Sequence, residues 1–259
     1  MTFAAADAAA AWMTDLWRSG RQATALPAEL RPATIAEGYD IQDRFVAGLG
    51  QEVAGWKLGV GNPRQRAETG AGGSIAGRIF AARCHRPGDV VALPDRAPVT
   101  IEFEIAYVLG RDIRPEDPVT DPMAAIGETR VTFELVRSRF VDRRAVGWPS
   151  FAADNAAFEA LVIGAPVDGA ELDALAASAV VLVDGEERAR SLTGEDATDP
   201  VQAFVDFVAL ARQRGMTLPK GAIVSTGTVT KPFNIEGAVT IEARYLDQRV
   251  GFRTSVRHD

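Results

Sequence analysis

Three glutamates on two apolar segments are the residues whose types and spacing point most directly to chemistry. Glu102 and Glu104 lie in T-I-E-F-E-I-A-Y-V-L, and Glu134 lies in R-V-T-F-E-L-V. Apolar, β-branched and aromatic residues dominate both segments, which predicts two β-strands. Residues two apart on a strand face the same way, so Glu102 and Glu104 share one face. Because the neighbours on both faces predict burial, and buried like charges are costly without a cation, we expect the three carboxylates to bind one hard divalent metal ion.

The residue types available as ligands favour magnesium or manganese. Carboxylate oxygens suit Mg²⁺ or Mn²⁺, whereas zinc prefers nitrogen and sulfur ligands. The sequence has only two histidines, His85 and the penultimate His258, so we expect neither a histidine-rich metal site nor a Ser/His/Asp triad. Cys84 precedes His85, but neighbouring side chains on an extended chain point in opposite directions. We therefore expect Cys84 to be an ordinary packed thiol.

Three further polar elements have both a structural and a functional interpretation. Lys57 lies in the apolar run G-W-K-L-G-V. In the structural interpretation its stem packs while its ammonium reaches water. In the functional interpretation the ammonium is buried and transfers protons or holds an anion. Asp154 and Asn155, in A-A-D-N-A-A, either cap a turn or contribute to a site. The run S-T-G-T at residues 225–228 is either a strand-end turn or a cradle for a carboxylate. Residue types alone leave these alternatives open.

Helices followed by strands are expected to position these side chains. Residues 3–19 predict an amphipathic helix, and Thr34 with Glu37 forms a capping-box pattern at the start of a second helix. From residue 53 onward, short apolar runs broken by Gly, Pro and Asp predict a β-rich body. The predicted fold class is α+β, with a helical N-terminal region at residues 1–70 packed on a β-rich core at residues 71–259 as one compact unit.

Turn signals divide the β-rich part further. Asp121-Pro122 predicts a short helix and Asp199-Pro200 a longer one, since aspartate caps a helix and proline fits its first turn. Asp184-Gly185 predicts a hairpin between two short strands. Residues 61–77 are rich in glycine and predict a flexible segment.

Composition limits the possible functions. The chain has 259 residues and 47% hydrophobic content, enough to bury a sizeable core. A formal net charge of -7 argues against nucleic-acid binding, and no basic run favours anionic lipid. The single cysteine fits a reducing compartment, the N-terminus has no basic leader, and no apolar run approaches the ~20 residues of a membrane span. We therefore expect a cytoplasmic protein with neither a nucleic acid nor a membrane as its partner.

An ordered series of motifs resembles the 2-keto-4-pentenoate hydratase family of the fumarylacetoacetate hydrolase superfamily, which also contains 4-oxalocrotonate decarboxylases. From about residue 55 to the C-terminus the series runs K-x-G, E-x-E-I-A, F-E-x-x-x-S-R, A-D-N-A and G-x-I-V-x-T-G-T-x-T-x-P-F. The resemblance implies a β-rich roll with flanking helices and assembly into homo-oligomers. It also implies three metal ligands, a proton-transfer pair and four substrate-binding residues: Glu102, Glu104 and Glu134; Lys57 and Asp154; Asn155, Thr226, Gly227 and Thr228.

Departures from the family pattern lie around these motifs. Gly61 and Asn62 stand where the family usually has threonine and serine, Arg137 replaces an aspartate, and Ala157 replaces a serine. The longer helix predicted from Asp199-Pro200 through Arg214 also lacks the family's tryptophan. The metal motif is intact while the pocket lining differs, which indicates a familiar reaction on an unfamiliar substrate, or a loss of activity.

The function implied by the resemblance is that of a lyase. The first expectation is a metal-dependent hydratase that adds water to a 2-hydroxy-2,4-dienoate, the tautomer of a 2-oxo-4-enoate, to give a 4-hydroxy-2-oxo acid. The runner-up is a decarboxylase of a 2-oxo-enedioate. An acylpyruvate hydrolase is a third possibility, although its usual His/Glu pair has no obvious counterpart here. The alternative from another class is a non-catalytic oligomer in which the metal only stabilises the fold.

Overall fold

The computed structural model describes residues 3–69, 73–94, 97–118 and 121–257. Six α-helices lie within the described residues: α1 (Ala6–Ser19), α2 (Ile35–Leu49), α3 (Pro63–Thr69), α4 (Gly147–Ala153), α5 (Leu172–Ser178) and α6 (Pro200–Gln213). Short 3-10 helices occur at η1 (Ala28–Leu30), η2 (Ala81–Arg83), η3 (Pro122–Ala125), η4 (Asn155–Ala157), η5 (Gly169–Glu171) and η6 (Gly194–Asp196).

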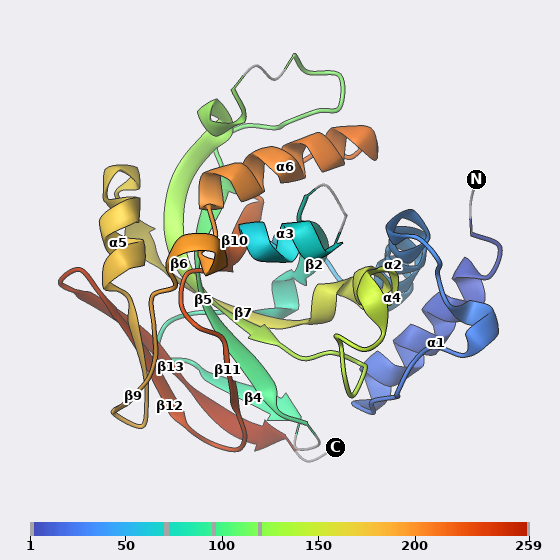
Figure 1. The fold of residues 1–259 in the computed structure, drawn as a ribbon, viewed down its shortest axis with the longest axis horizontal. Coiled ribbons are helices and arrows are strands. Elements are labelled where there is room, and N and C mark those ends of the chain that lie inside the picture. The colour runs from blue at the N-terminus through green and yellow to red at the C-terminus, as the bar shows by residue number, and fades with distance from the viewer. Residues whose placement is uncertain (1–2, 70–72, 95–96, 119–120, 258–259) are drawn as a thin grey trace.

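The strands form two sheets, which lie side by side in Figure 1. The larger, eight-stranded sheet has the order β2-β1-β10-β5-β6-β7-β3, with β11 beside β5. Its strands are β1 (Val53–Gly59), β2 (Ile75–Phe80), β3 (Cys84–His85), β5 (Val99–Leu109), β6 (Ile126–Val136), β7 (Phe158–Val167), β10 (Ile223–Thr228) and β11 (Phe233–Ile235). The smaller sheet has the order β4-β13-β12-β8-β9. Its strands are β4 (Val90–Pro94), β8 (Val180–Val183), β9 (Glu186–Arg190), β12 (Thr240–Tyr245) and β13 (Gln248–Arg257).

Aromatic side chains on one face of β5 and β6 pack against the smaller sheet. The ring centroid of Phe103 lies 5.1 Å from that of Phe133 and 5.6 Å from that of Tyr245, while Phe133 lies 5.2 Å from Phe252. Because side chains alternate along a strand, this packing directs the intervening residues, Glu102 among them, to the opposite face. The smaller sheet therefore buries one face of β5 and β6 and leaves the other for the glutamates.

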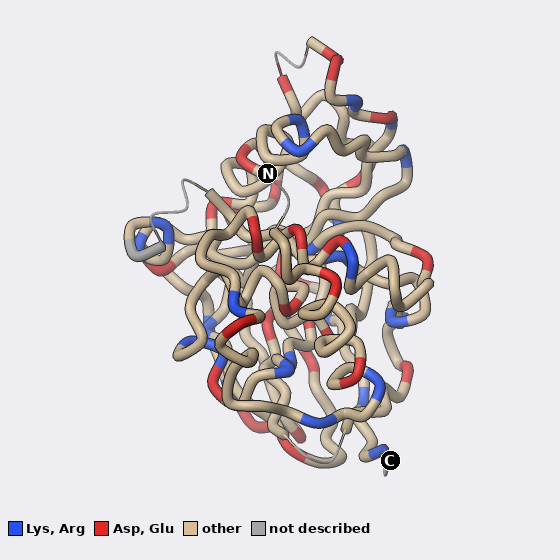
Figure 2. The backbone as a smooth tube through the Cα atoms, turned by 90° about the vertical axis from the view of Figure 1, so that its right-hand side faces the viewer, with Lys and Arg blue, Asp and Glu red and all other residues tan. Residues whose placement is uncertain are grey.

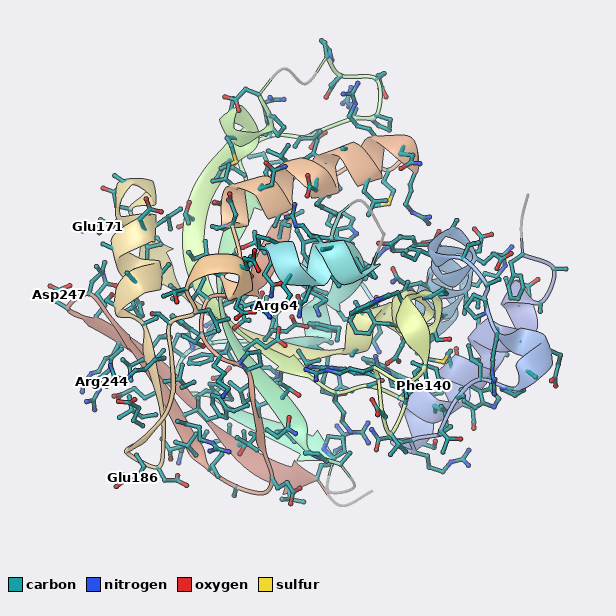
Figure 3. The ribbon with its side chains drawn as sticks, in the orientation of Figure 1. Arg64, Phe140, Glu171, Glu186, Arg244 and Asp247 are labelled. Atoms are coloured by element: carbon teal, nitrogen blue, oxygen red, sulfur yellow. The ribbon has the colours of Figure 1, made fainter. Side chains whose placement is uncertain are left out.

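Helices cover the rest of the larger sheet. Helix α6 lies across it in Figure 1, with Phe204 against Tyr107 and Phe207 against Trp56 at centroid separations of 5.5 Å. Helices α1, α2 and α4 gather on the right of the same view. Phe140, labelled in Figure 3, joins the segment after β6 to α1 by stacking on Trp12. The predicted α+β class, with a β-rich body and flanking helices, is confirmed.

The N-terminal helices follow their sequence signals. Helix α1 ends at Gly20, whose φ of 63° is the left-handed conformation that glycine adopts readily. The side chain of Thr34 accepts a hydrogen bond from Glu37 N, and Glu37 Oε2 accepts one from Thr34 N, so the predicted capping box is present. Strand β1, although it belongs to residues 1–70, pairs with β2 and β10 inside the large sheet. The boundary between residues 70 and 71 lies outside the described residues, and the two-region division stays a proposal.

Two local predictions were wrong in part. Within residues 61–77 the chain forms α3 and enters β2, because Asn62 Oδ1 accepts a hydrogen bond from Gln65 N at 2.8 Å and Pro63 fits the first turn. The short helix after Asp121 is of the 3-10 type, η3, with Asp121 capping Met123 N. The predicted hairpin at residues 184–185 is present, with positive φ at both positions.

Charged residues of both signs are interspersed along the backbone in Figure 2. Glu186, Arg244 and Asp247, which belong to strands of the smaller sheet or the turns between them, lie on the left of Figure 3. Among the described residues, no helix has the length and apolar character needed to cross a membrane.

Candidate metal centre

The three glutamates predicted as metal ligands converge on one point of the large sheet. Strands β5 and β6 are antiparallel, and their register sets Glu102 opposite Glu134 and Glu104 opposite Thr132. One carboxylate oxygen from each glutamate lies within 4.8 Å of the other two. Glu104 and Glu134 are fully buried, and Glu102 is partly exposed.

A layer of hydrogen bonds holds Glu104 in place. Its Oε2 accepts hydrogen bonds from Ser225 Oγ at 2.6 Å and from Gly227 N at 3.2 Å. The Ser225 hydroxyl is in turn 2.7 Å from the hydroxyl of Thr132. Of the two interpretations open for residues 225–228, Ser225 and Gly227 therefore form the carboxylate cradle, and the carboxylate they hold is that of Glu104. The sequence did not identify Glu104 as this partner, because the contact depends on the antiparallel pairing of β10 with β5.

The remaining carboxylate oxygens have the properties expected of cation ligands. Glu104 Oε1 and Glu134 Oε2 are buried and have no hydrogen-bond partner among the described residues, while Glu134 Oε1 lies 3.0 Å from the ammonium nitrogen of Lys57. Burial, followed by the charges of Glu134 and Glu102, raises the pKa of Glu104 well above its usual value. Burial and the charge of Glu102 likewise raise the pKa of Glu134 to about 7, although Lys57 acts in the opposite direction. A divalent cation would satisfy these oxygens and favour their ionised form, so the residues present fit such an ion.

Lys57 completes a line of polar residues across the adjacent strands β1, β10, β5 and β6. It lies beside Ser225 in the parallel pairing of β1 with β10. Its Nζ is 3.0 Å from Glu134 Oε1 and donates a hydrogen bond to Ala156 O, also at 3.0 Å. The side chain is only 3% exposed. Of the two interpretations open from the sequence, the buried lysine is the one observed.

A cavity opens above this line. Glu102, Lys57, Gly227 and Thr228 line it at the acidic end, while Glu104 and Glu134 lie beneath its surface. Its walls include both apolar and polar side chains: Leu58, Val60, Val136, Trp148, Phe151, Asn62 and Gln65. The cavity therefore has a candidate metal centre at one end, and its apolar and polar walls suit a small organic acid.

Two arginines at the mouth of this cavity were not predicted from the sequence. Arg143 Nη2 lies 3.8 Å from Glu102 Oε1, and Arg144 is exposed beside it. Both also line an outer recess, together with Arg64 on α3, which Figure 3 labels and which pairs with Asp196 at 2.8 Å. Within the described lining of the inner cavity, Glu102 is the only acidic side chain. The mouth is consequently cationic.

Three of the predicted site residues do not line the cavity, and their side chains form hydrogen bonds with neighbouring residues instead. Asp154 is fully buried and its carboxylate accepts hydrogen bonds from Ser138 Oγ and Arg139, so it does not form the expected pair with Lys57. Asn155 is bonded through its side chain to the backbone of Arg78. The hydroxyl of Thr226 donates to Ile105 O at 2.7 Å. The side chains of these three residues are thus bonded to neighbouring protein groups, outside the cavity lining.

The departures from the family pattern divide between the cavity and the interior. Gly61 and Asn62 line the cavity, and a Cβ at Gly61 would approach Thr198 Cγ2 to 2.9 Å. Arg137 is buried and donates to Gly20 O, while Ala157 is a buried residue with a φ of 62°. His85 lies on β3, away from the cavity lining, and His258 lies outside the described residues.

Comparison with known proteins agrees with this architecture. The family model for the fumarylacetoacetate (FAA) hydrolase C-terminal domain matches residues 80–249. The chain therefore belongs to that family.

Several curated and solved proteins are similar over most of the chain. A 2-keto-4-pentenoate hydratase from Paraburkholderia phymatum is 27% identical over 232 residues, covering 87% of this chain and 88% of the relative. A 4-oxalocrotonate decarboxylase from a Pseudomonas species is 25% identical over 211 residues, covering 80% and 82%. The solved structure of the 4-oxalocrotonate decarboxylase from Pseudomonas putida G7, complexed with magnesium and adipate, has a TM-score of 0.81 at 21% identity and covers 97% of both chains.

Proposed function

We propose that this protein is a metal-dependent lyase that hydrates a 2-hydroxy-2,4-dienoate to a 4-hydroxy-2-oxo acid. The observation that carries the proposal is the buried trio of carboxylates at the end of a cavity that also contains Lys57. The similarity to several 2-keto-4-pentenoate hydratases, each 27% identical over three quarters or more of this chain, supports the same reaction class.

Glu102, Glu104 and Glu134 would hold the metal ion, for which we propose Mg²⁺ or Mn²⁺. The solved relatives include a decarboxylase complexed with magnesium and a fumarylpyruvate hydrolase complexed with Mn²⁺ and pyruvate. When bound, such an ion supplies Lewis acidity that stabilises negative charge on the oxygen at C2 of a 2-oxo acid.

The chain's own groups would move the protons. Conversion of the dienol to the 2-oxo-3-enoate removes the proton of the 2-hydroxyl and adds one at C5. Addition of water then places hydroxyl at C4 and a proton at C3. Lys57 is the proposed proton carrier, because this residue lines the cavity, whereas Asp154 does not line it and is bound by Arg139 and Ser138. Gly227 and Thr228 lie at the same end of the cavity and are proposed to contact the substrate.

Decarboxylation of a 2-oxo-enedioate is the second candidate, and the cationic mouth favours it. Arg143 and Arg144 would pair with a second carboxylate that a 2-hydroxydienoate with a single carboxylate lacks. With a divalent ion bound to three ionised glutamates, Lys57 and the two arginines leave the cavity with two net positive charges, which balance a dianion. The similarity to 4-oxalocrotonate decarboxylases supports this alternative.

One assay separates the candidates. The protein is incubated with Mg²⁺ and a panel of 2-hydroxydienoates with one or two carboxylates. Loss of the conjugated ultraviolet band with incorporation of water indicates the hydratase, and release of CO₂ indicates the decarboxylase. A protein that turns over none of the panel, yet loses thermal stability with a chelator, would favour a purely structural metal. Homo-oligomeric assembly and a cytoplasmic location remain part of the proposal.

A further inference from the structure

The ammonium of Lys57 depends on one backbone carbonyl for its position. A lysine ammonium has three N–H donors. For Lys57, one donates to Ala156 O at 3.0 Å, and the group also lies 3.0 Å from Glu134 Oε1. Lys57 lines the cavity, and its Nζ lies 5.9 Å from the ring centroid of Phe151, another lining residue. Because the side chain is buried, the position of Ala156 O restricts where the ammonium can lie.

Ala156 belongs to an unusual turn between α4 and β7. Asn155, Ala156 and Ala157 all have positive φ, at 52°, 49° and 62°. Consecutive non-glycine residues in the left-handed region are unfavourable, so the surrounding structure must hold them there. All three residues are fully buried.

Arg139 holds the two ends of this turn. Its guanidinium donates to Asp154 O on one side and, at 2.9 Å, to Phe158 O on the other. It also forms an ion pair with the carboxylate of Asp154, which accepts a further hydrogen bond from Ser138 Oγ at 2.6 Å. Arg139 and Asp154 are both fully buried, so this ion pair spans the turn inside the protein.

Asn155 and Gly77 fix the turn against β2. Asn155 Oδ1 accepts from Arg78 N at 2.6 Å, and its Nδ2 donates to Arg78 O at 2.9 Å. The neighbouring Gly77 lets the backbones approach, since a Cβ at that position would lie 2.2 Å from Asn155 O. The contact therefore requires glycine at position 77.

We infer that Arg139, Asn155 and Gly77 are positioning residues for Lys57: they hold a left-handed turn whose Ala156 carbonyl orients the lysine ammonium toward the cavity. The inference rests on the proposed function for its catalytic consequence. Its structural part, the orientation of the Lys57 ammonium by the turn, does not depend on that function. Asp154 then acts through Arg139 and the turn, with no direct part in proton transfer.

The test compares Gly77→Ala with Gly251→Ala. In each variant the new Cβ meets a backbone oxygen, Asn155 O for the first and Ile241 O, at 2.5 Å, for the second. Gly251 lies on β13 of the smaller sheet, so its variant controls for general loss of stability. The readout is the ¹³Cε resonance of Lys57 in lysine-labelled protein, which has only three lysines, assigned by its disappearance in Lys57→Met.

For Gly77→Ala we expect a displaced Lys57 resonance, unchanged resonances of Lys220 and Lys231, and a loss of kcat on the order of 100-fold with Mg²⁺ affinity retained. Gly251→Ala should retain the wild-type resonance and kcat. Because Gly77 also lies directly opposite Lys57 in the pairing of β1 with β2, Asn155→Asp is measured beside Gly77→Ala with the same readouts. This variant loses the donor to Arg78 O without changing either strand's pairing residue, so a wild-type Lys57 resonance in it would also overturn the inference. A wild-type Lys57 resonance in the folded variant, or an equal displacement in Gly251→Ala, would overturn the inference. If the wild-type protein turned over no substrate, the proposed function would fail while the resonance would still decide the positioning role.

Discussion

Glu102 and Glu134 lie directly opposite each other on the paired strands β5 and β6, with Glu104 two residues farther along β5. Directly opposed like charges destabilise a strand pair in the absence of a counter-charge. Lys57 next to Glu134 and Arg143 next to Glu102 supply two positive charges for the three carboxylates, and no ion pair in the described residues involves Glu104. This imbalance is the physical basis for proposing a bound divalent ion.

Replacing Lys57 with methionine should separate metal binding from turnover. Lys57→Met keeps a side chain of similar length and apolar character but removes the proposed proton carrier, so kcat should fall by about 10² to 10⁴. Mg²⁺ affinity should persist, because all three carboxylates remain. Lys220→Met, at an exposed position, is the matched control. Unimpaired turnover of Lys57→Met would remove the lysine from the mechanism.

Without metal, the folded protein should lose stability as the pH rises toward neutrality. The pKa of Glu134 is raised to about 7 in the folded state, above its ordinary 4.5. The folded state therefore binds more protons in this interval, and the stabilisation is complete below pH 4.5 and lost as the pH rises through about 7. Thermal unfolding with a chelator between pH 5 and 8 should show this decline, and Glu134→Gln should weaken it. An equal decline in Glu134→Gln would show that another group causes it.

Ser225 should contribute to metal affinity through Glu104. Ser225→Ala removes the hydroxyl that donates to Glu104 Oε2, and loss of such a supporting hydrogen bond typically weakens metal binding about 10- to 100-fold. Thr226→Val is the matched control on the same strand, because that hydroxyl donates to Ile105 O instead. Equal Mg²⁺ affinities of the two variants, measured by calorimetry, would contradict the supporting role.

The two arginines at the cavity mouth should select for a second carboxylate. Arg144→Ala should lower kcat/KM for a 2-oxo-enedioate by about tenfold, the value of one charge-assisted hydrogen bond, and leave a monocarboxylate substrate unaffected. Arg64→Ala is a nearby control, because Arg64 is paired with Asp196. An equal loss of kcat/KM for both substrates would mean that Arg144 stabilises the loop and does not distinguish a dicarboxylate from a monocarboxylate.

The fold and the acidic trio were predictable because they follow from local patterns. The strand period of two placed Glu102 and Glu104 on one face, and the capping box at Thr34 and Glu37 fixed the start of α2. The motif order identified the family, and with it the position of Lys57. These signals are local, whereas the approach of Glu134 to Glu102 also depends on the pairing of β5 with β6, which are consecutive strands along the chain.

The surroundings of the trio were not predictable from local patterns. Ser225 reaches Glu104 only through the register between β10 and β5, which are more than a hundred residues apart in the chain. Asp154 was expected beside Lys57, yet the buried Arg139 binds it, and nothing in the spacing distinguishes these two partners. Arg143 and Arg144 lie in a polar stretch that is typical of an exposed loop. Only the path of the chain after β6 brings them to the cavity.

Calorimetric titration with Mg²⁺ tests the central claim most directly. We expect the wild-type protein to bind one ion per chain, and Glu102→Gln and Glu104→Gln to remain folded while losing affinity by more than about 100-fold. Glu128→Gln, on the same sheet but paired with Arg130, should bind like the wild type. Unchanged Mg²⁺ affinity in the Glu102 and Glu104 variants would contradict the assignment of the carboxylate trio as the metal site.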